Sequence, residues 1–194
     1  MAWLEKKFVN RKKKARLNIG KVRQALDKLE IKTLHNVLEI GCGIGMVSAF
    51  LAETYGMNVY GTDYDAAEID LAKTLQSEHE KLHFAVEDAT ALSFENNAFD
   101  LVISQNVFHH IPAWRLALTE IVRVLRHEGY LIWSDLAFPG SLIRVLRPII
   151  KNYSLYTYEN VKSSFTQCGL YALDHQGLTR GLFLHHDTVF RKVG

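Results

Sequence analysis

Short apolar runs alternate with helical patterns along most of the chain. The runs with the character of strands are NVLEI, NVYGTD, LHFAVED, FDLVISQ and GYLIWSD. Between them, the stretches MVSAFLAETY, AEIDLAKTLQSE and AWRLALTEIVRVLR carry apolar residues at helical spacing. Strands rich in Val, Ile and Leu that alternate with helices are typical of a parallel sheet covered on both faces. The pattern therefore predicts a doubly wound α/β fold.

The last part of the chain has a different pattern. A helical stretch from Thr157 to Cys168 ends at Gly169. The segments LYALDH and HDTVFRKV then have the character of strands, and about ten residues separate them. A connection of this length is short enough for antiparallel pairing, so we expect an antiparallel strand pair here.

The first part of the chain is strongly basic. The segment KKFVNRKKKARLN is rich in Lys and Arg, and a charge run of this kind is usually a solvated face or a mobile arm. From Lys21 onward, apolar residues recur at helical spacing, which predicts a helix packed on the body of the protein. We expect a basic N-terminal arm over residues 1–20 and a single domain over residues 21–194.

Composition constrains the cellular compartment of the protein more than it constrains its function. The 194 residues carry a formal net charge of +2, which by itself indicates neither a nucleic acid nor a membrane. The two cysteines, Cys42 and Cys168, cannot form a disulfide framework or a cysteine metal site. The small number of cysteines fits a reducing, cytoplasmic compartment. No apolar run has the length of a membrane span or the character of a signal peptide, so we expect a soluble protein.

A glycine-rich turn stands between the first strand and the helix that follows it. The stretch VLEIGCGIG contains Gly41, Gly43 and Gly45. Glycines there let backbone N–H groups and a helix N-terminus approach a ligand closely. In open α/β sheets, ligands bind beyond the carboxyl ends of the strands. The turn is therefore the predicted ligand site.

Acidic residues at the strand ends indicate which ligand this is. Asp63 lies 22 residues beyond Gly41, where a carboxylate can accept both hydroxyls of a ribose. A dinucleotide fingerprint would need glycine at position 46, which is Met46, so the spacing is GxGxG. The pattern favours a nucleoside ligand without a pyrophosphate. Glu39 and Asp88 also end strands.

Five segments in order resemble the motifs of the class I S-adenosylmethionine-dependent methyltransferases. They are VLEIGCGIG, VYGTDYD, VEDATALSF, FDLVISQNVFHHI and VLRHEGYLIWSD. The resemblance implies a Rossmann-like, seven-stranded mixed sheet in the order 3-2-1-4-5-7-6, with the seventh strand antiparallel and helices on both faces. It implies S-adenosyl-L-methionine as cofactor and S-adenosyl-L-homocysteine as product.

The resemblance also implies roles for single residues. Glu39, Gly41 and Gly43 would lie along the methionine moiety, and Asp63 would accept the ribose hydroxyls with Tyr64 beside the adenine. The carboxylate of Asp88 and the backbone of Ala89 would recognise the adenine edge. Gln105 and Asn106 would face the methyl donor and the substrate.

Structural roles remain open for several of these residues. Asp63 or Asp88 could cap a helix, because Asp is favoured at strand-to-helix turns. Glu39 could mainly tie down the glycine turn, and Cys42 is expected to be small packing rather than a nucleophile.

Four of the nine histidines stand in two adjacent pairs. His109, after the fourth strand, could take a proton from the acceptor as a catalytic residue, or one imidazole of the His109–His110 pair could pack while the other hydrogen-bonds locally. His185 and His186 should alternate to opposite faces of a strand, so we expect no metal site there.

The acceptor is constrained mainly by what the fourth motif lacks. Enzymes that methylate the amino group of adenine or glutamine resemble one another in an Asn/Asp-Pro-Pro-aromatic tetrad, whereas this chain has QNVF. We expect methyl transfer to a small molecule at oxygen, nitrogen or carbon. An RNA or protein methyltransferase stays open, as does a non-catalytic S-adenosylmethionine-binding module.

Residues 136–157 are the expected substrate-covering insertion. Arg144, Arg147 and Lys151 recur on one side of a helical pattern, and Pro148 should kink or restart the helix. The cations could remain in water, pair with an acidic substrate, or contact an anionic membrane surface. The basic arm leaves a nucleic-acid partner open.

Overall fold

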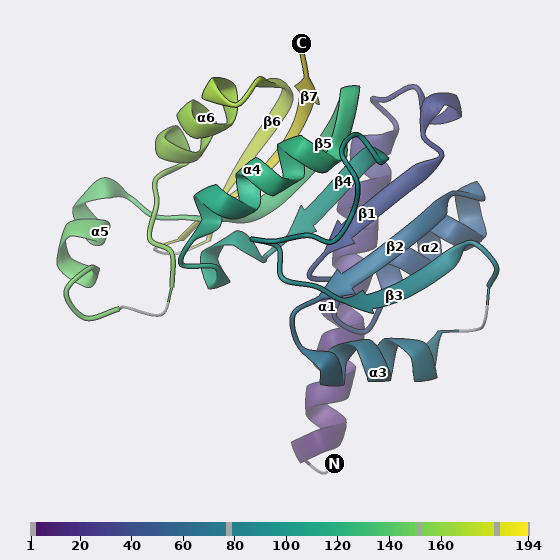
Figure 1. Ribbon diagram of the computed structural model, residues 1–194. Helices are drawn as coiled ribbons and strands as arrows, with labels where there is room; N and C mark the ends of the chain where they lie inside the picture. Colours follow the sequence, from purple (N-terminus) through teal and green to yellow (C-terminus); the bar gives the residue numbers. More distant parts are fainter. Residues whose placement is uncertain (1–2, 77–78, 151–152, 181–182, 194) are drawn as a thin grey trace. The chain divides into compact units, whose positions relative to one another are not determined.

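The structure is a computed structural model that describes residues 3–76, 79–150, 153–180 and 183–193. The chain forms two compact units, Met1–Val86 and Glu87–Gly194 (Figure 1). The end of the predicted helix at residues 77–78 lies outside the described residues, as does Lys151. The expectation of a single domain over residues 21–194 stays a prediction.

The first unit is a three-stranded parallel sheet with its helices. Its elements are α1 (Trp3–Leu26), η1 (Ile31–Thr33), β1 (Asn36–Ile40), α2 (Met46–Tyr55), β2 (Asn58–Asp63), α3 (Ala66–Leu75) and β3 (Leu82–Val86). Strand β2 pairs in parallel with both β1 and β3. The two glycine-turn elements, β1 and α2, thus begin a βαβ unit, as the apolar pattern predicts.

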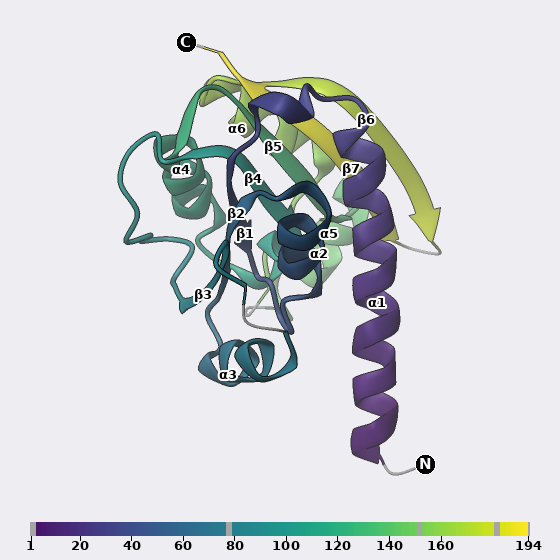
Figure 2. The same ribbon diagram turned by 90° about the vertical axis from the view of Figure 1, so that its right-hand side faces the viewer.

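Helix α1 is longer than the apolar pattern indicates. It runs without a break from Trp3 to Leu26 and packs against α2 (Figure 2). Its last part carries the apolar residues that pack inward, with Val22 and Leu26 fully inaccessible. The basic run is therefore the first part of a helix, because Lys, Arg and Leu all favour helical backbone.

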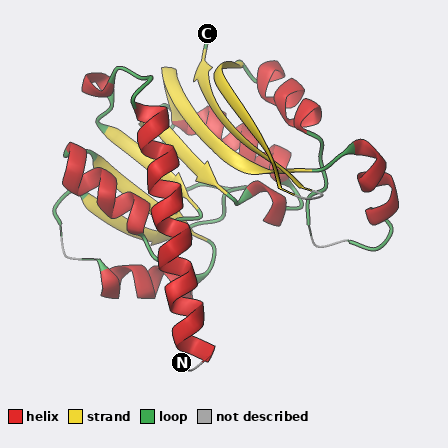
Figure 3. Ribbon diagram, turned by 180° about the vertical axis from the view of Figure 1, so that it is seen from behind, coloured by secondary structure: helices red, strands yellow, loops and turns green. Residues whose placement is uncertain are grey.

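The second unit contains the longer strands. Its elements are β4 (Phe99–Gln105), η2 (Phe108–His110), α4 (Trp114–Val124), β5 (Leu125–Ala137), α5 (Gly140–Leu146), α6 (Tyr158–Gln167), β6 (Leu170–Arg180) and β7 (Phe183–Lys192). Strands β4 and β5 are parallel, and β7 is antiparallel to both β5 and β6 (Figure 3). Helix α6 agrees with the predicted stretch from Thr157 to Cys168, and Thr157 caps it.

The antiparallel strand pair is confirmed, but its strands are longer than predicted. The register continues through Gly177 opposite His186 and Leu178 opposite His185. The sequence pattern predicts about ten connecting residues between LYALDH and HDTVFRKV, and these include QGLTRG. Backbone pairing with β7 continues the ladder regardless of this composition, since β-sheet hydrogen bonds do not depend on side chains.

The seven strands are ordered β3-β2-β1-β4-β5-β7-β6. This order, with β7 antiparallel, confirms the predicted fold class. Within the described residues, no helix is both long enough and apolar enough to cross a bilayer.

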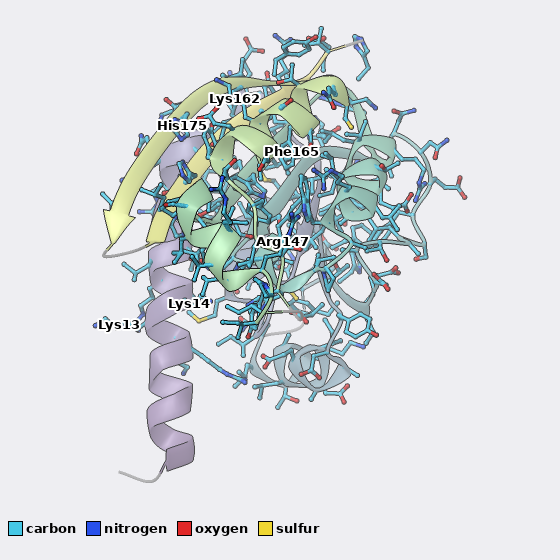
Figure 4. The ribbon with its side chains drawn as sticks, turned by 90° about the vertical axis from the view of Figure 1, so that its left-hand side faces the viewer. Lys13, Lys14, Arg147, Lys162, Phe165 and His175 are labelled. Carbon is cyan, nitrogen blue, oxygen red and sulfur yellow. The ribbon has the colours of Figure 1, made fainter. Side chains whose placement is uncertain are left out.

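An aromatic cluster forms the core beneath η2 in the second unit. The ring centroid of Phe108 lies 6.3 Å from that of Trp133 and 5.8 Å from that of Phe165. The ring centroids of Trp133 and Phe165 are 5.8 Å apart. All three side chains are fully buried. Figure 4 marks Phe165 on α6, the helix that covers β6. Because aromatic burial is strongly stabilising, this cluster fixes the loop after β4 and the end of β5.

Candidate functional site

The glycine turn has the backbone conformation that glycine makes possible. Gly41, Gly43 and Gly45 have φ values of 72°, 53° and 73°, all in the left-handed region. Gly45 is also the residue before α2, so the first N–H groups of that helix follow the turn directly. The turn thus offers bare backbone and a helix N-terminus, which suit a polar or charged ligand.

The third glycine has a packing reason as well. A Cβ atom built on Gly45 would lie 2.6 Å from Cε1 of Phe84, and one built on Gly61 would lie 2.7 Å from the same atom. The Phe84 side chain of β3 therefore occupies the space that side chains at these glycines would need. The ring supports the turn from within the first unit.

Asp63 ties the glycine turn to the end of β2. The N–H of Gly43 donates to Oδ2 of Asp63 at 2.9 Å, and the N–H of Asp65 donates to Oδ1 at 3.1 Å. A helix-capping role does not hold for Asp63, because the side chain that caps α3 is that of Asp65. The Asp63 carboxylate is partly exposed, and a carboxylate with two oxygens can accept further hydrogen bonds from a ligand.

Glu39 lies behind the turn, in the interior of the first unit. It is 4% exposed and accepts a hydrogen bond from the hydroxyl of Ser48 on α2. The hydroxyl of Thr62 donates to the main-chain oxygen of Glu39 at 2.9 Å. Burial raises the pKa of the Glu39 carboxyl to about 7, against the lowering effect of the Ser48 hydrogen bond. Glu39 therefore links β1, β2 and α2, as a turn-fixing role requires.

Two neighbours of the turn differ in accessibility. Tyr64 directly follows Asp63 and is 77% exposed, which leaves its ring free to cover a ligand. Cys42 is 8% exposed, and burial raises the pKa of its thiol well above the usual range. A thiol that stays protonated is a poor nucleophile, in agreement with the packing role expected for Cys42.

An ion pair from α1 borders the same turn. Nη2 of Arg11 lies 2.7 Å from Oε1 of Glu68 on α3. A Cβ atom built on Gly43 would lie 3.9 Å from Oε2 of the same glutamate, so this ion pair lies beside the turn. Part of the basic run thus has a structural partner in the first unit. The sequence contained no signal for this pair, because 57 positions separate the two residues.

In the second unit, Asp88 and Ala89 form a tight turn. Oδ1 of Asp88 accepts from the N–H of Thr90 at 2.8 Å and from the Thr90 hydroxyl at 2.7 Å. These hydrogen bonds lower the pKa of Asp88, the backbone one most. No helix begins at this turn, so a capping role fails for Asp88 also. The Asp88 side chain is exposed and Ala89 is buried.

The loop after β4 is held by β5 and β7. Gln105 ends β4 and is 6% exposed. Asn106 has a φ of 59°, and its N–H donates to the Ser134 oxygen at 2.7 Å. Its side-chain oxygen lies 3.3 Å from Nε2 of His185. Among non-glycine residues, Asn is one of those that adopt left-handed backbone most readily.

Asp135 organises the beginning of η2. It is fully buried, and its Oδ2 accepts from the N–H of Val107 at 3.1 Å and from that of His109 at 3.4 Å. Its Oδ1 accepts from the N–H of Leu136 at 2.6 Å and contacts Nδ1 of His109. Since this carboxylate already accepts from backbone N–H groups, Nδ1 of His109 carries the proton and donates it. In the neutral imidazole, Nε2 of His109 is then the nitrogen that carries the lone pair.

Tyr156 and Tyr153 complete this part of the second unit. Burial and the nearby Asp135 carboxylate raise the pKa of the Tyr156 hydroxyl. The Tyr153 ring lies 5.3 Å from that of His110, which is exposed. The two adjacent histidines therefore differ, because the buried acid orients the imidazole of His109.

The sequence prediction missed Asp135 and Tyr156. Asp135 stands at the end of the apolar run GYLIWSD, so the strand-end rule applied to Glu39, Asp63 and Asp88 could have found it. Tyr156 has no such signal, because it belongs to an irregular stretch before α6.

The C-terminal histidines point to opposite faces of β7, as predicted. His186 is buried and stacks on Tyr158 at 4.2 Å, and its Nδ1 lies 2.9 Å from Nε2 of His175, which Figure 4 marks on β6. Burial lowers the pKa of His186 to about 4. His185 contacts Asn106 instead.

Comparison with known proteins decides the family. The family model described as a methyltransferase domain matches residues 38–133, which include the glycine turn, Asp63 and the loop after β4. The chain belongs to the class I S-adenosylmethionine-dependent methyltransferases. The predicted family is thereby confirmed.

Individual relatives of this methyltransferase domain are distant. A 2-methyl-6-phytyl-1,4-hydroquinone methyltransferase of Synechocystis sp. is 38% identical over 99 residues, which are 51% of this chain and 31% of that protein. A glycine/sarcosine/dimethylglycine N-methyltransferase of Actinopolyspora halophila is 27% identical over 178 residues, 87% of this chain and 31% of that protein. The chain thus spans about a third of the length of these relatives.

A solved structure shows the same fold. The SAM-dependent methyltransferase from Methanosarcina mazei superposes with a TM-score of 0.69 at 22% identity, covering 83% of this chain and 93% of that one.

Proposed function

We propose that the whole protein transfers the methyl group of S-adenosylmethionine to a small-molecule acceptor and releases S-adenosylhomocysteine. The observation that carries this proposal is the glycine turn whose Gly43 N–H is bonded to Asp63. Curated relatives named for a hydroquinone and for glycine and its methylated forms support a small acceptor. The acceptor itself is not identified by these names.

In the first unit, we assign the sulfonium nucleoside to the surroundings of the glycine turn. Gly41 and Gly43 would lie along the methionine moiety, with Glu39 supporting the turn from behind. Asp63 would accept the ribose hydroxyls, because its oxygens are partly exposed and held in place by two N–H groups. The exposed ring of Tyr64 would lie against the adenine.

In the second unit, we assign the adenine edge to the turn at Asp88 and Ala89. The Asp88 carboxylate is exposed, its lowered pKa favours the ionised form that accepts an amino hydrogen, and the Ala89 N–H could donate to a ring nitrogen. Gln105 and Asn106 would face the donor methyl group and the acceptor. The left-handed backbone of Asn106 directs the chain out of β4 at this position.

His109 would act on the acceptor as a general base. The acceptor atom forms a bond to the methyl carbon while the carbon–sulfur bond breaks and the sulfur keeps the electron pair. The proton that an acceptor hydroxyl or amine must lose goes to Nε2 of His109. Asp135 is a positioning residue, because it holds Nδ1 and thereby leaves Nε2 as the basic nitrogen. Alignment of donor and acceptor supplies most of the remaining rate enhancement.

The experiment is a screen of small-molecule acceptors with methyl-labelled S-adenosylmethionine, paired with calorimetric titration of S-adenosylhomocysteine. Label transferred to a small molecule, together with cofactor binding, supports the proposal. Binding without transfer to any acceptor would favour a non-catalytic binding module, and transfer to RNA or protein alone would favour a macromolecular methyltransferase. Absence of binding would contradict the cofactor assignment.

A further inference from the structure

A segment of the second unit exposes large apolar side chains beside arginines. Helix α5 spans Gly140–Leu146 and projects away from the strands of its own unit (Figure 1). Val145 is 65% exposed and Ile149 is 75% exposed. Isolated exposed apolar residues are common, but these two belong to one short helical stretch that also carries Arg144 and Arg147. We call residues 140–150 the α5 segment.

The helical hydrogen bonds continue beyond the end of α5. The N–H of Arg147 donates to the Ile143 oxygen at 2.9 Å, and that of Ile150 donates to the Leu146 oxygen at 2.8 Å. Arg147 has helical backbone angles. The α-helix ends at Leu146, before Pro148, and hydrogen-bonded turns continue the chain past the proline, whose missing N–H cannot contribute a bond. Side-chain directions can therefore be followed around α5, which ends at Leu146, and approximately through the hydrogen-bonded turns that continue it to Ile150.

On that helix, apolar and basic residues lie on different sides. With about 100° per residue, the apolar residues cover one continuous arc of about 160°: Val145, Ile149, Leu142, Leu146, Ile150 and Ile143. Arg147 and Arg144 lie outside this arc. Leu142, Ile143, Leu146 and Ile150 are half-buried, so Val145 and Ile149 form the exposed margin of the apolar arc. This arrangement is that of a helix lying in a membrane interface.

The positive charge of the α5 segment favours an anionic partner. Between Asp135 and Glu159 the sequence contains no acidic residue, although the chain has 21 acidic residues in 194. A shallow depression of about 490 Å³ is lined by Gly140, Ile143, Arg144, Arg147 and Pro148. The two guanidinium groups could there hold the oxygens of an anionic lipid headgroup. Figure 4 marks Arg147 on this surface.

Two residues that follow the α5 segment in the sequence, Tyr153 and Ser154, contact the loop that carries His109. The N–H of Ser154 donates to the His109 oxygen at 2.9 Å, and the ring of Tyr153, which is 49% exposed, lies parallel to the His109 ring at 6.4 Å. Tyrosine is favoured at membrane interfaces, where one end of the ring is apolar and the hydroxyl is wet.

We propose that the α5 segment docks the protein on an anionic membrane surface, with Val145 and Ile149 in the acyl boundary and Arg144 and Arg147 at the headgroups. The inference does not depend on methyl transfer, so vesicle binding tests it separately from the activity. A surface of this kind would bring an acceptor dissolved in the membrane to the part of the second unit that contains His109.

The test is sedimentation of the full chain with two kinds of vesicle, phosphatidylcholine alone and phosphatidylcholine mixed with phosphatidylglycerol. We expect binding to the mixed vesicles only, weakened by salt. The double variant Arg144→Gln/Arg147→Gln should lower the partition coefficient about thirtyfold, the effect of two cations at an anionic surface. The variant Val145→Ser/Ile149→Ser should lower it at least about tenfold, with circular dichroism confirming that both variants are folded.

Matched controls distinguish binding through the α5 segment from non-specific effects of surface charge and of exposed apolar side chains. Lys13→Gln/Lys14→Gln removes two exposed charges from α1 (Figure 4), and Leu116→Ser/Leu173→Ser removes two exposed apolar side chains from α4 and β6. Both should bind the mixed vesicles like the native chain. Equal binding of the native chain to both kinds of vesicle, or to neither, overturns the proposal. So does a control variant that loses as much binding as the matching α5 variant.

Discussion

Replacing Asp135 with Asn should turn the His109 imidazole to its other tautomer. The native carboxylate serves two pairs of donors: Oδ2 accepts from the Val107 and His109 N–H groups, and Oδ1 accepts from the Leu136 N–H and the His109 ring. Asn keeps one oxygen and has an NH2 group in place of the other. If the oxygen stays with the first pair, the NH2 group faces Nδ1 of His109, which can then only accept. The proton moves to Nε2.

The size of the effect follows from the same contacts. The N–H of Leu136 loses its acceptor beside a fully buried side chain, which costs about 1–3 kcal/mol of folding stability. A base whose lone pair points the wrong way forfeits the contribution of general-base catalysis, which is about a hundredfold to ten-thousandfold in turnover. The loss should appear in kcat rather than in KM, because Asp135 acts through His109 and not on the substrate.

The tautomer can be measured without knowing the acceptor. In the native chain labelled with 15N-histidine, the nitrogen chemical shifts of His109 should report a protonated Nδ1 and an unprotonated Nε2. In Asp135→Asn the assignment should reverse, whereas His110→Gln should leave the His109 signals unchanged and help to assign them. A native His109 with its proton on Nε2 would refute the reasoning, as would an Asp135→Asn variant that keeps the native tautomer and full turnover.

Three further outcomes are expected. Asp63→Ala should weaken S-adenosylhomocysteine binding by at least about tenfold in calorimetric titration, because hydrogen bonds to a charged group contribute about 1.5–3 kcal/mol each. Gly45→Ala should lower the free energy of unfolding in urea by about 2–4 kcal/mol, from left-handed strain and the clash with Phe84. Gly56→Ala, with φ of 65° and open space, should show the strain alone. The native chain should lose about 3 kcal/mol of folding stability as the pH rises from about 4.5 to 7, because of the raised pKa of Glu39. The variant Glu39→Gln should not show this loss.

The sign of the Glu39 effect follows from its raised pKa. Below about pH 4.5 the carboxyl is protonated in both the folded and the unfolded chain, so it adds no pH dependence. As the pH rises toward 7 the unfolded chain releases this proton first, and unfolding becomes easier. Glu53→Gln, at an exposed position of α2, is the matched control and should keep the native slope. A native chain without any such slope would contradict the burial argument.

Controls for the other two variants use neighbouring residues. Asp65→Ser keeps a side chain that can cap α3, and it should leave cofactor affinity unchanged. Equal affinities for Asp63→Ala and the native chain would contradict the ribose assignment. If Gly45→Ala were no less stable than Gly56→Ala, the Phe84 ring would not constrain the turn.

The local pattern of apolar and polar residues was sufficient to predict much of the fold. The strand and helix periods predicted β1 to β5 and α2 to α4 in order, because each parallel strand contains a short apolar run and the helices carry apolar residues at helical spacing. It was insufficient where packing overrides composition. The basic run lies within helix α1, which begins at Trp3, and β6 continues through QGLTR because β7 pairs with it.

The candidate site divides in the same way. Its glycines and Asp63 are recognisable in the sequence, since a turn that needs left-handed backbone leaves few residues but glycine, and a strand-end carboxylate has a fixed distance from it. The partners of His109 were not recognisable, because 26 positions separate it from Asp135. Which of two adjacent imidazoles meets a buried acid depends on how β5 and η2 pack around the aromatic cluster.

The sequence by itself determined the strand-to-helix alternation, the glycine turn and the carboxylate at the end of β2. These features depend on backbone conformation and on periodicity over a few residues. Only the tertiary structure decided that Asp135 holds His109, that Asp65 rather than Asp63 caps α3, and that Val145 and Ile149 remain exposed. Each of these depends on which distant residues come into contact, and that is set by the packing of the whole unit.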